Sequence, residues 1–427
     1  MSGPLPDWHR IKWRGDSGLN DGCSVGYDLT GGFYDAGDFL KIHFPQSHAL
    51  NVLAWGMAEF KSGYTAAGQF DNSLRILKWG IDHFKKCHPV DHPLYPNIFF
   101  GQIGNSNIDH SSWGRPEDME MERPVYEISE QKPGTELAAG VAASFASAAL
   151  VFGQHWGWQD SYAQDCLKRA RELLSFGVEH LGTYHLAIPD AVNSYKSWGG
   201  YNDEIVLAAA WIAKASFFLE NSKYSADLAR AVSLYSQFTP PPAYEFSWEN
   251  KGAGGEYLMW QLTGDSKYLN AFDDFLNRIE SGNKTPGGMY FIQQWGSARH
   301  AANVAFLFAL NGQLQAAKEQ IDFILGHGKN GQPIIDGQPG SYLVGYGDVY
   351  PTEPHHASAS CPATGVDCNW NTFNAQGPNS WILHGALVGK FYFISLPVNQ
   401  YVFKVVPMWL KITLQMIDRT MLPMKLH

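Results

Sequence analysis

Two carboxylates stand three residues apart in the segment GGFYDAGDFLKIHFP, at residues 31–45. Asp35 and Asp38 are separated by an Ala-Gly pair, so a tight turn could hold one water molecule between them. This arrangement suits an inverting glycosidase, in which one carboxylate deprotonates water and a distant carboxylic acid protonates the leaving oxygen. The same spacing is also typical of an Asx-rich turn or a helix cap. The spacing alone leaves both interpretations open.

The composition is that of a folded globular chain. Of the 427 residues, 45% are hydrophobic and 14% are aromatic. Charged residues make up 17% of the chain, against about 25% in an average soluble protein. This mixture excludes a disordered chain, a coiled coil and a collagen-like repeat. The formal net charge is −10 and no Lys/Arg run stands out, so we expect no nucleic-acid partner.

Neither end of the chain predicts a membrane segment. Residues 1–10 lack the basic start and the apolar stretch of a signal peptide. The most apolar region, residues 391–410, is interrupted by Pro397 and Pro407 among other polar breaks. A membrane-spanning helix needs about 18 or more apolar residues in a row. We therefore expect no membrane partner.

Helical periodicity dominates the chain. Apolar residues recur at i, i+3 and i+4 spacing, as in Leu74, Leu77 and Ile81. The ten stretches with this pattern are 46–62, 71–87, 135–153, 161–181, 203–218, 223–237, 251–262, 266–279, 297–311 and 314–325. The long loops rich in Gly, Pro, Trp and Tyr are 14–45, 89–134, 183–202, 239–250 and 326–385. Long loops in a compact domain are usually functional. Successive helical hairpins with such loops at one end predict an all-α toroid.

The cysteines predict one local disulfide. Cys361 and Cys368 enclose the short loop CPATGVDC, and no second pair at this spacing completes a zinc site. Residues 326–331 spell G-x-G-x-x-G, but they follow a helical stretch and not a strand, which argues against a dinucleotide site. Five cysteines with one such pair favour an oxidising compartment slightly.

A longer match gives the carboxylate pair a more specific meaning. The segments WRGDSGLNDG and DLTGGFYDAGDFLKIHFP resemble the catalytic-base region of glycoside hydrolase family 9, the inverting endo-β-1,4-glucanases. Further segments resemble the family in family order: DHSSWGRPEDM, SYKSWGGYNDE, WGSARHAAN, PHH and CNWNTFN. The resemblance covers residues 9–389 and has the character of the animal branch, of the termite-cellulase kind. It implies a secreted, monomeric (α/α)6 barrel, with residues 1–389 as its catalytic domain, that hydrolyses internal bonds of cellulose.

The same resemblance assigns roles to individual residues. It implies that Asp38 is the general base, that Asp35 helps to hold the nucleophilic water, and that His355 binds sugar near the catalytic centre. The positions that match further sugar subsites are His110, Trp113, Tyr195, Trp198, Trp248, Trp295 and Arg299. Flat aromatic rings suit the apolar faces of pyranose rings, with a few polar groups for the hydroxyls. A single tryptophan taken alone is more often a core residue.

The resemblance also implies a possible structural calcium site, and no other cofactor. Asp203 and Glu204 follow Gly199 and Gly200, with Glu249 as a possible third carboxylate. Calcium prefers carboxylate and carbonyl oxygens. The alternative is that the two acids offset the macrodipole at the start of the predicted helix.

The chain departs from the family near its catalytic acid. In the family, the segment after GALVG (385–389) leads to a glutamate that protonates the leaving group, whereas no glutamate follows Glu353 here. Residues 390–427 look like a divergent apolar tail. Ala357 stands where the family has an arginine, and Val349 stands at a position that is usually polar or basic. The alternative function is therefore a catalytically impaired glucan-binding member or an incomplete isoform.

The expected barrel is incomplete at both ends. The family barrel has twelve helices, and the pattern predicts ten, because the first and last helices have no counterpart. We therefore expect the apolar faces of 46–62 and 314–325 to be uncovered and the protein to be poorly soluble.

Overall fold

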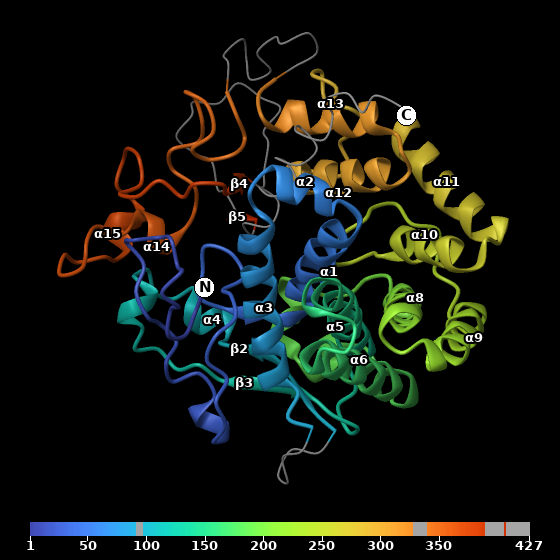
Figure 1. Cartoon of the computed structure of the whole chain (residues 1–427). Helices are drawn as coiled ribbons and strands as arrows, with labels where there is room; N and C mark the ends of the chain where they lie inside the picture. Colours follow the sequence, from blue (N-terminus) through green and yellow to red (C-terminus); the bar gives the residue numbers. More distant parts are fainter. Residues whose placement is uncertain (91–96, 328–339, 389–404, 407–427) are drawn as a thin grey trace.

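Long helices follow one another around a common centre in the computed structural model, which describes residues 1–90, 97–327, 340–388 and 405–406 (Figure 1). The inner helices are α1 (His43–Glu59), α5 (Thr135–Trp156), α8 (Asn202–Leu219), α10 (Gly252–Thr263) and α12 (Ser297–Leu310), and the first four pack on one another in this order. The outer helices are α3 (Phe70–Cys87), α6 (Ser161–Glu179), α9 (Asn221–Gln237), α11 (Ser266–Ser281) and α13 (Leu314–Ile324). Each outer helix packs against the inner helix before it. The predicted all-α toroid of helical hairpins is confirmed, and every predicted helix agrees with the observed bounds to within one turn.

The inner helix α5 lies in the middle of the core. Its residues from Thr135 to Gly153 are all buried. Small residues let it approach α1 closely: a Cβ at Gly140 would lie 2.7 Å from Ser47 Oγ, and Ser144 Oγ donates to the Ser47 carbonyl at 2.7 Å. By length and composition α5 could also cross a membrane, but the qualifying window is entirely buried within the protein. Burial of this kind is typical of the core helix of a globular protein.

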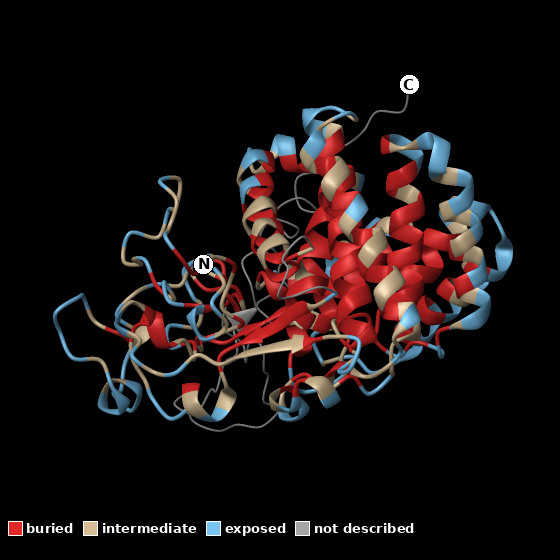
Figure 2. Cartoon of the chain, turned by 90° about the horizontal axis from the view of Figure 1, so that it is seen from below, coloured by how far each residue is buried: buried red, intermediate tan, exposed pale blue. Residues whose placement is uncertain are grey.

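The outer helices bury one face and expose the other, as Figure 2 shows by the change from buried to exposed residues across them. In α3, the predicted apolar stripe of Leu74, Leu77 and Ile81 is buried. The start of α6 is fixed by Asp160, whose side chain accepts the N–H groups of Tyr162 and Ala163. Such a cap satisfies N–H groups that have no partner within the helix.

A small antiparallel sheet was not predicted from the sequence. Strands β1 (Lys41–Ile42), β2 (Phe99–Ile103) and β3 (Val125–Ile128) pair in that order, with Lys41 opposite Ile103. The strands are short, and β2 is buried throughout, so they show no alternation of apolar and polar residues. The sheet places the end of the 31–45 segment beside the segment that leads into the short helix α4 (Ser106–Asp109).

Short elements occupy the long loops. They are η1 (Cys23–Val25), α2 (Lys61–Ala66), η2 (Pro116–Asp118), α7 (Tyr184–Ala187), η3 (Pro189–Asn193), α14 (Ala357–Ser360) and α15 (Trp370–Phe373). Near the end of the described chain, β4 (Leu387–Val388) pairs with β5 (Val405–Val406). The rest of the predicted tail, residues 390–404 and 407–427, lies outside the described residues, as do residues 328–331 of the glycine-rich segment.

The expectation of uncovered apolar faces on two helices is wrong. Leu50 and Leu53 of α1 are 4% and 1% exposed, and Ile321 and Ile324 of α13 are equally buried. On α1, both leucines line a cavity of about 210 Å³ together with Trp8. Trp8 itself packs against the core, so the first residues of the chain contribute to covering α1.

Burial of acidic groups predicts a stability that falls with rising pH. Glu136, in the first turn of α5, is fully buried, and this burial raises its pKa from 4.5 to about 8. Between these two values the folded protein holds a proton that the unfolded chain releases, so the free energy of unfolding decreases as pH rises through this window. We expect the Tm to fall by several degrees from pH 5 to pH 9 in thermal unfolding followed by circular dichroism.

The variant Glu136→Gln tests this origin because glutamine cannot ionise. We expect it to flatten the dependence of Tm on pH, whereas Glu179→Gln, at an exposed position on α6, should leave that dependence unchanged. Equal slopes for Glu136→Gln and the parent protein would contradict the assignment.

Candidate active site

The turn that carries the two aspartates is held by backbone contacts. The N–H of Asp35 donates to the Leu40 carbonyl at 2.8 Å, and the N–H of Ala357 donates to the Gly37 carbonyl at 2.9 Å. A Cβ at Gly37 would lie 2.2 Å from the carbonyl oxygen of His355, so only glycine permits this approach. The turn therefore packs directly against the segment 355–357, although the two are far apart in the sequence.

Asp35 is oriented by a tyrosine from another loop. Its Oδ2 accepts a hydrogen bond from the Tyr195 hydroxyl at 2.6 Å, and both side chains are largely buried. Burial first, and then the charge of Asp35, raise the pKa of Tyr195 well above its usual value. Tyr195 is therefore a permanent hydrogen donor to Asp35. The Trp248 ring packs edge-on against Tyr195, with 4.9 Å between ring centroids.

Asp38 lies beside the residues that follow β2. Its Oδ2 is 3.5 Å from His110 Nε2, while its Oδ1 is buried without a hydrogen-bond partner in the described structure. The neighbouring Asp109 accepts the N–H of Phe39 at 3.1 Å. Burial, followed by the charge of Asp38, raises the pKa of Asp109 to about 7. A protonated Asp109 adds no second negative charge beside Asp38, which keeps one carboxylate oxygen available for a proton.

Most of the predicted sugar-binding residues from the middle of the chain meet in one cavity. This cavity of about 300 Å³ is lined by Asp35, Tyr195, Trp198, Trp248, Trp295 and Arg299 among others. The indoles of Trp198 and Trp295 are 72% and 42% exposed, which is unusual for tryptophan in a folded core. Exposed rings on the wall of a cavity can stack on a flat ligand. Their assignment to a sugar-binding cleft stays a prediction.

A second aromatic group surrounds Trp113. The Trp113 ring is 5.0 Å from that of His355 and 4.7 Å from that of Phe373, measured between centroids. Trp113 Nε1 donates to Ser360 Oγ at 2.9 Å, and Trp113 lines a separate cavity of about 540 Å³. His355 thus belongs to the group around Trp113, His110 lies beside Asp38, and Tyr195 lines the first cavity together with Asp35.

The loop behind Trp113 is fixed covalently. Cys361 and Cys368 form a disulfide, as the sequence predicted. The Arg115 guanidinium also donates to the carbonyls of Pro362 and Ala363. These contacts hold the wall of the larger cavity in place.

His355 and His356 are adjacent in the sequence but make different contacts. His355 contacts the aromatic group described above, whereas His356 accepts the N–H of Ala359 through Nδ1 at 3.1 Å. Burial lowers the pKa of His356 to about 3, so it acts as a neutral cap of α14. Ala357 is buried and Val349 is 49% exposed. Neither side chain supplies the hydrogen donor that the resemblance would place there.

The three carboxylates predicted to bind calcium come from the start of α8 and from the segment before α10. Each of them already has a partner. Glu204 pairs with Lys251 Nζ at 2.6 Å, and Asp203 accepts the N–H of Lys251. Glu249 accepts the N–H groups of Trp198 and Gly199 at 3.0 and 2.8 Å, and the loop continues through Gly200.

The fit to calcium is therefore partial. Glu204 Oε2 is buried without a hydrogen-bond partner in the described structure, which would suit a cation. The three carboxylates, however, are not among the side-chain groups that converge within 4.8 Å in the part of the chain described. Calcium stays a prediction, and no step below depends on it.

Sequence reasoning missed some residues of the site. Glu245 lines the same cavity as Asp35, lies 3.1 Å from His300 Nδ1, and has its pKa raised to about 7, chiefly by burial. No motif marks it. Asp109 had a signal, since it precedes His110 in the DHSSW segment, and Phe373 lies within the CNWNTFN segment.

The family model of glycosyl hydrolase family 9 matches residues 1–390. The chain belongs to this family. Among family 9 structures it is similar to an endoglucanase from the termite Nasutitermes takasagoensis, with 38% identity, a TM-score of 0.86, and coverage of 97% of this chain and 93% of the termite chain. A cellulase of C. cellulolyticum, solved in complex with cellobiose, is 26% identical with a TM-score of 0.80, over 97% of this chain and 93% of that one.

Among curated proteins, the family 9 chain is 33% identical to Endoglucanase 5 of Arabidopsis thaliana over 435 residues. The match covers 91% of this chain and 66% of the plant protein, so the chain spans about two thirds of that relative's length.

Proposed function

We propose that this family 9 protein hydrolyses internal β-1,4-glucosidic bonds with inversion, with Asp38 as the general base. The observation that carries the proposal is that Asp35 and Asp38, on one turn, line the same cavity of about 210 Å³. Asp35 also lines the cavity that contains Trp295, and Phe39, the residue after Asp38, lines the cavity that contains Trp113. A carboxylate placed in this way can take a proton from a water molecule next to a bound sugar.

Asp35 has a positioning role in this proposal. Its Oδ2 accepts the Tyr195 hydroxyl at 2.6 Å, which fixes the carboxylate on the turn that also carries Asp38 and so helps to hold the water beside the base. The water would then attack the anomeric carbon from the face opposite the leaving group, which inverts the configuration. His110, within 3.5 Å of Asp38 Oδ2, would contact the sugar at the cleavage point.

The substrate class follows from the aromatic walls and from the relatives. Stacked indoles and a few polar groups suit a chain of pyranose rings. The relatives are endoglucanases, and the C. cellulolyticum cellulase binds cellobiose. A β-1,4-glucan is therefore the substrate we propose. The disulfide between Cys361 and Cys368 is consistent with an extracellular location.

A second candidate is a glucan-binding protein with impaired catalysis. The specific observation behind it is that no glutamate follows Glu353, so the family's catalytic acid has no counterpart in the sequence. The two candidates share the cleft and differ in turnover. Measuring glucan binding and reducing-sugar release on the same purified sample distinguishes them: binding with turnover supports the hydrolase, and binding without it supports the second candidate.

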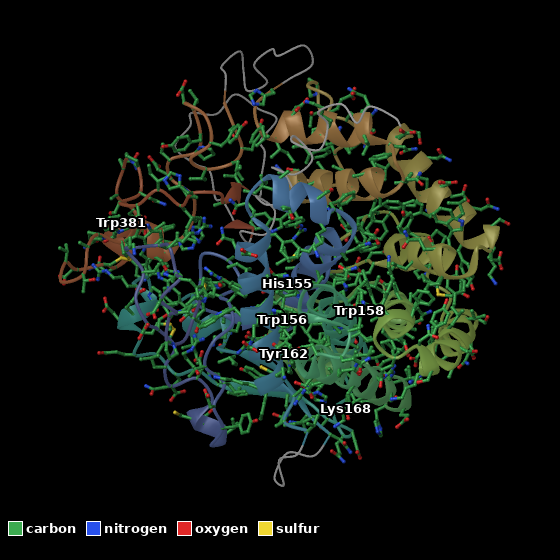
Figure 3. All side chains as sticks on the ribbon, viewed as in Figure 1. His155, Trp156, Trp158, Tyr162, Lys168 and Trp381 are labelled. Carbon is green, nitrogen blue, oxygen red and sulfur yellow. A yellow bond between two sulfur atoms is a disulfide. The ribbon has the colours of Figure 1, made fainter. Side chains whose placement is uncertain are left out.

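We expect cello-oligosaccharides to bind in the cleft and to change tryptophan fluorescence. Each aromatic contact contributes about 0.5–1.5 kcal/mol, so Trp295→Ala and Trp198→Ala should each raise the Kd by about 2–10-fold. Trp156→Ala is the matched control, because Trp156 is 40% exposed but lies beside Tyr162 at the end of α5 (Figure 3).

The titration should extend to millimolar ligand. A fluorescence change that is the same in Trp156→Ala and weaker in the two cleft variants would support the assignment. Equal Kd values for all variants, or no change at all, would contradict it.

A further inference from the structure

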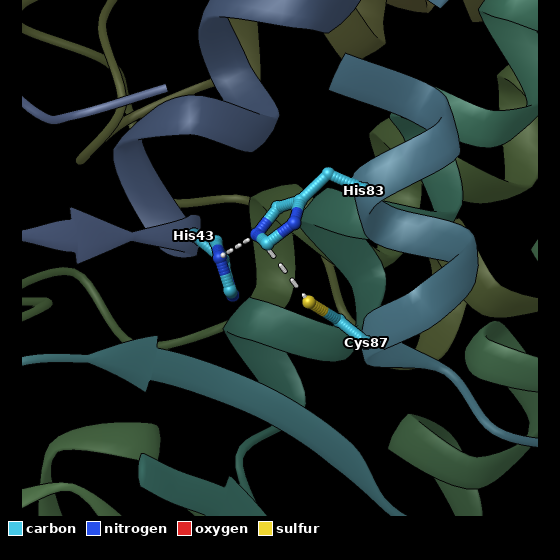
Figure 4. A group of neighbouring side chains, drawn as sticks. All are labelled: His43, His83 and Cys87. Atoms are coloured by element: carbon cyan, nitrogen blue, oxygen red, sulfur yellow. Dashed lines mark hydrogen bonds between the residues drawn. The ribbon is translucent and has the colours of Figure 1, made fainter. Parts of the chain in front are cut away.

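A histidine pair and a cysteine converge in the core, apart from the glucan cleft (Figure 4). His43 is the first residue of α1, and His83 and Cys87 lie one turn apart on α3. All three side chains are at most 1% exposed. His43 Nε2 is 3.0 Å from His83 Nε2, and Cys87 Sγ is 3.5 Å from the same His83 nitrogen. The ligand atoms of the three residues all lie within 4.8 Å of one another.

The outer nitrogens of both rings face backbone carbonyls. His43 Nδ1 lies 2.7 Å from the Phe100 carbonyl oxygen, and His83 Nδ1 lies 3.4 Å from that of Thr30. A carbonyl only accepts, so a bond to it requires the proton on Nδ1 and leaves the lone pair of a neutral ring on Nε2. Metal-binding histidines commonly have their other nitrogen fixed in this way.

With both carbonyl bonds made, two lone pairs would face each other at 3.0 Å, which is unfavourable unless a positive group lies between them. In the metal-free protein, His83 can carry its proton on Nε2 and donate it to His43 Nε2. In that tautomer His83 Nδ1 has no proton, so the 3.4 Å hydrogen bond to the Thr30 carbonyl is lost. A metal ion would satisfy both rings and both carbonyls.

The distances match tetrahedral coordination. Bonds of about 2.05 Å to nitrogen and about 2.3 Å to sulfur at tetrahedral angles separate two nitrogens by about 3.3 Å and a nitrogen from a sulfur by about 3.6 Å. The observed separations are 3.0 and 3.5 Å. Small side-chain movements would therefore complete the geometry. Two imidazoles and a thiolate are the ligands that Zn²⁺ and Cu⁺ prefer.

We propose that His43, His83 and Cys87 form a buried structural binding site for one thiophilic metal ion, Zn²⁺ or Cu⁺. Binding breaks the S–H bond of Cys87 and forms a metal–sulfur bond, and the thiol proton leaves to solvent. The His83 proton returns to Nδ1, so both rings stay neutral. No oxidation or reduction is involved.

The neighbouring charges bear on which ion binds. Lys41, two residues before His43 in β1, forms an ion pair through Nζ with Asp21 at 2.6 Å, and Arg123 also pairs with Asp21. These groups leave no surplus negative charge next to the site. Cu⁺ with one thiolate forms a neutral complex that suits full burial, whereas Zn²⁺ leaves one positive charge and takes a fourth ligand. The two ions are therefore tested separately.

The test uses the full chain refolded with metal, since the site has no solvent exposure. Every sample carries Cys23→Ser, because Cys23 is an exposed thiol that could bind metal by itself. Co²⁺ serves as the spectroscopic substitute for Zn²⁺, and we expect one equivalent to give a thiolate-to-cobalt charge-transfer band. Competition with colorimetric chelators then measures the affinities for Zn²⁺ and Cu⁺.

Two cysteine variants give the decisive comparison. Cys87→Ser should abolish the cobalt band and weaken Zn²⁺ or Cu⁺ binding by about 100-fold or more, while Cys166→Ser, at another buried free cysteine, should retain both. Circular dichroism checks that each sample is folded, and His43→Asn provides a second variant if Cys87→Ser does not fold. Failure of the folded parent to bind either ion, or a band that persists in Cys87→Ser, would overturn the proposal. Neither outcome depends on glucanase activity.

Discussion

Purified protein of this sequence is expected to release reducing sugar from carboxymethylcellulose about 10²–10⁴-fold more slowly than the termite endoglucanase to which it is similar. General-acid protonation of the leaving oxygen contributes about this factor. The acid of an inverting enzyme stands about 6.5–9.5 Å from the base. No glutamate follows Glu353, and Asp418 is the sole carboxylate side chain after residue 389 in the sequence. Binding of cello-oligosaccharides, measured on the same sample, serves as the control for folding.

A rate within about tenfold of the termite enzyme would contradict this expectation and would require another acid. Glu245 would then be the first residue to test. It lines the cavity that also contains Asp35, and its raised pKa of about 7 keeps it protonated in mildly acidic solution. Loss of that activity in Glu245→Gln would identify it.

The second large effect concerns the base. In a chimera in which residues 390–427 are replaced by the corresponding segment of the termite endoglucanase, Asp38→Asn should lower kcat by about 10²–10⁴-fold with little change in KM. The amide keeps the shape of the side chain but cannot accept the proton from water. Asp28→Asn is the matched control, because Asp28 precedes the same turn but is exposed and paired with Lys86.

The chimera also tests the stereochemistry. Inversion of a β-glucosidic bond should give the α-anomer as the first product, which NMR detects before mutarotation. Turnover of Asp38→Asn within about tenfold of the chimera would contradict the role of Asp38, and a β-anomeric first product would contradict inversion. Asp35→Asn should also be slow, since the amide loses the negative charge and one of the two acceptor oxygens of the carboxylate.

The helices were predictable because their apolar residues repeat at one spacing over many turns. The stripe of Leu74, Leu77 and Ile81 shows this for α3. The sheet was not predictable from the same signal, since β2 is buried on both faces and β1 has two residues. Its pairing of Lys41 with Ile103 joins segments about sixty residues apart, which no local pattern reveals.

The candidate site, like the fold, was predictable only in part. The spacing of Asp35 and Asp38 left a simple turn as open as a catalytic pair, and the longer resemblance of the segment to the family assigned their roles. The same resemblance assigned the tryptophans to the cleft. The contacts of Asp38 with His110 and of Asp35 with Tyr195 depend on how distant loops pack, so the sequence indicated the residues but not the pairs. Glu245 carries no motif, and its raised pKa results from burial, which a sequence does not show.

The hydrogen bond from the Ala357 N–H to the Gly37 carbonyl determines which substitutions the 355–360 segment can accept during evolution. The link joins backbone to backbone, so it depends on no side chain at position 357, and every residue except proline can supply it. Ala357 is also buried, so the position accepts small residues most readily. Variants of the 355–360 segment that keep a small residue other than proline at 357 are therefore expected to preserve the link to the aspartate turn.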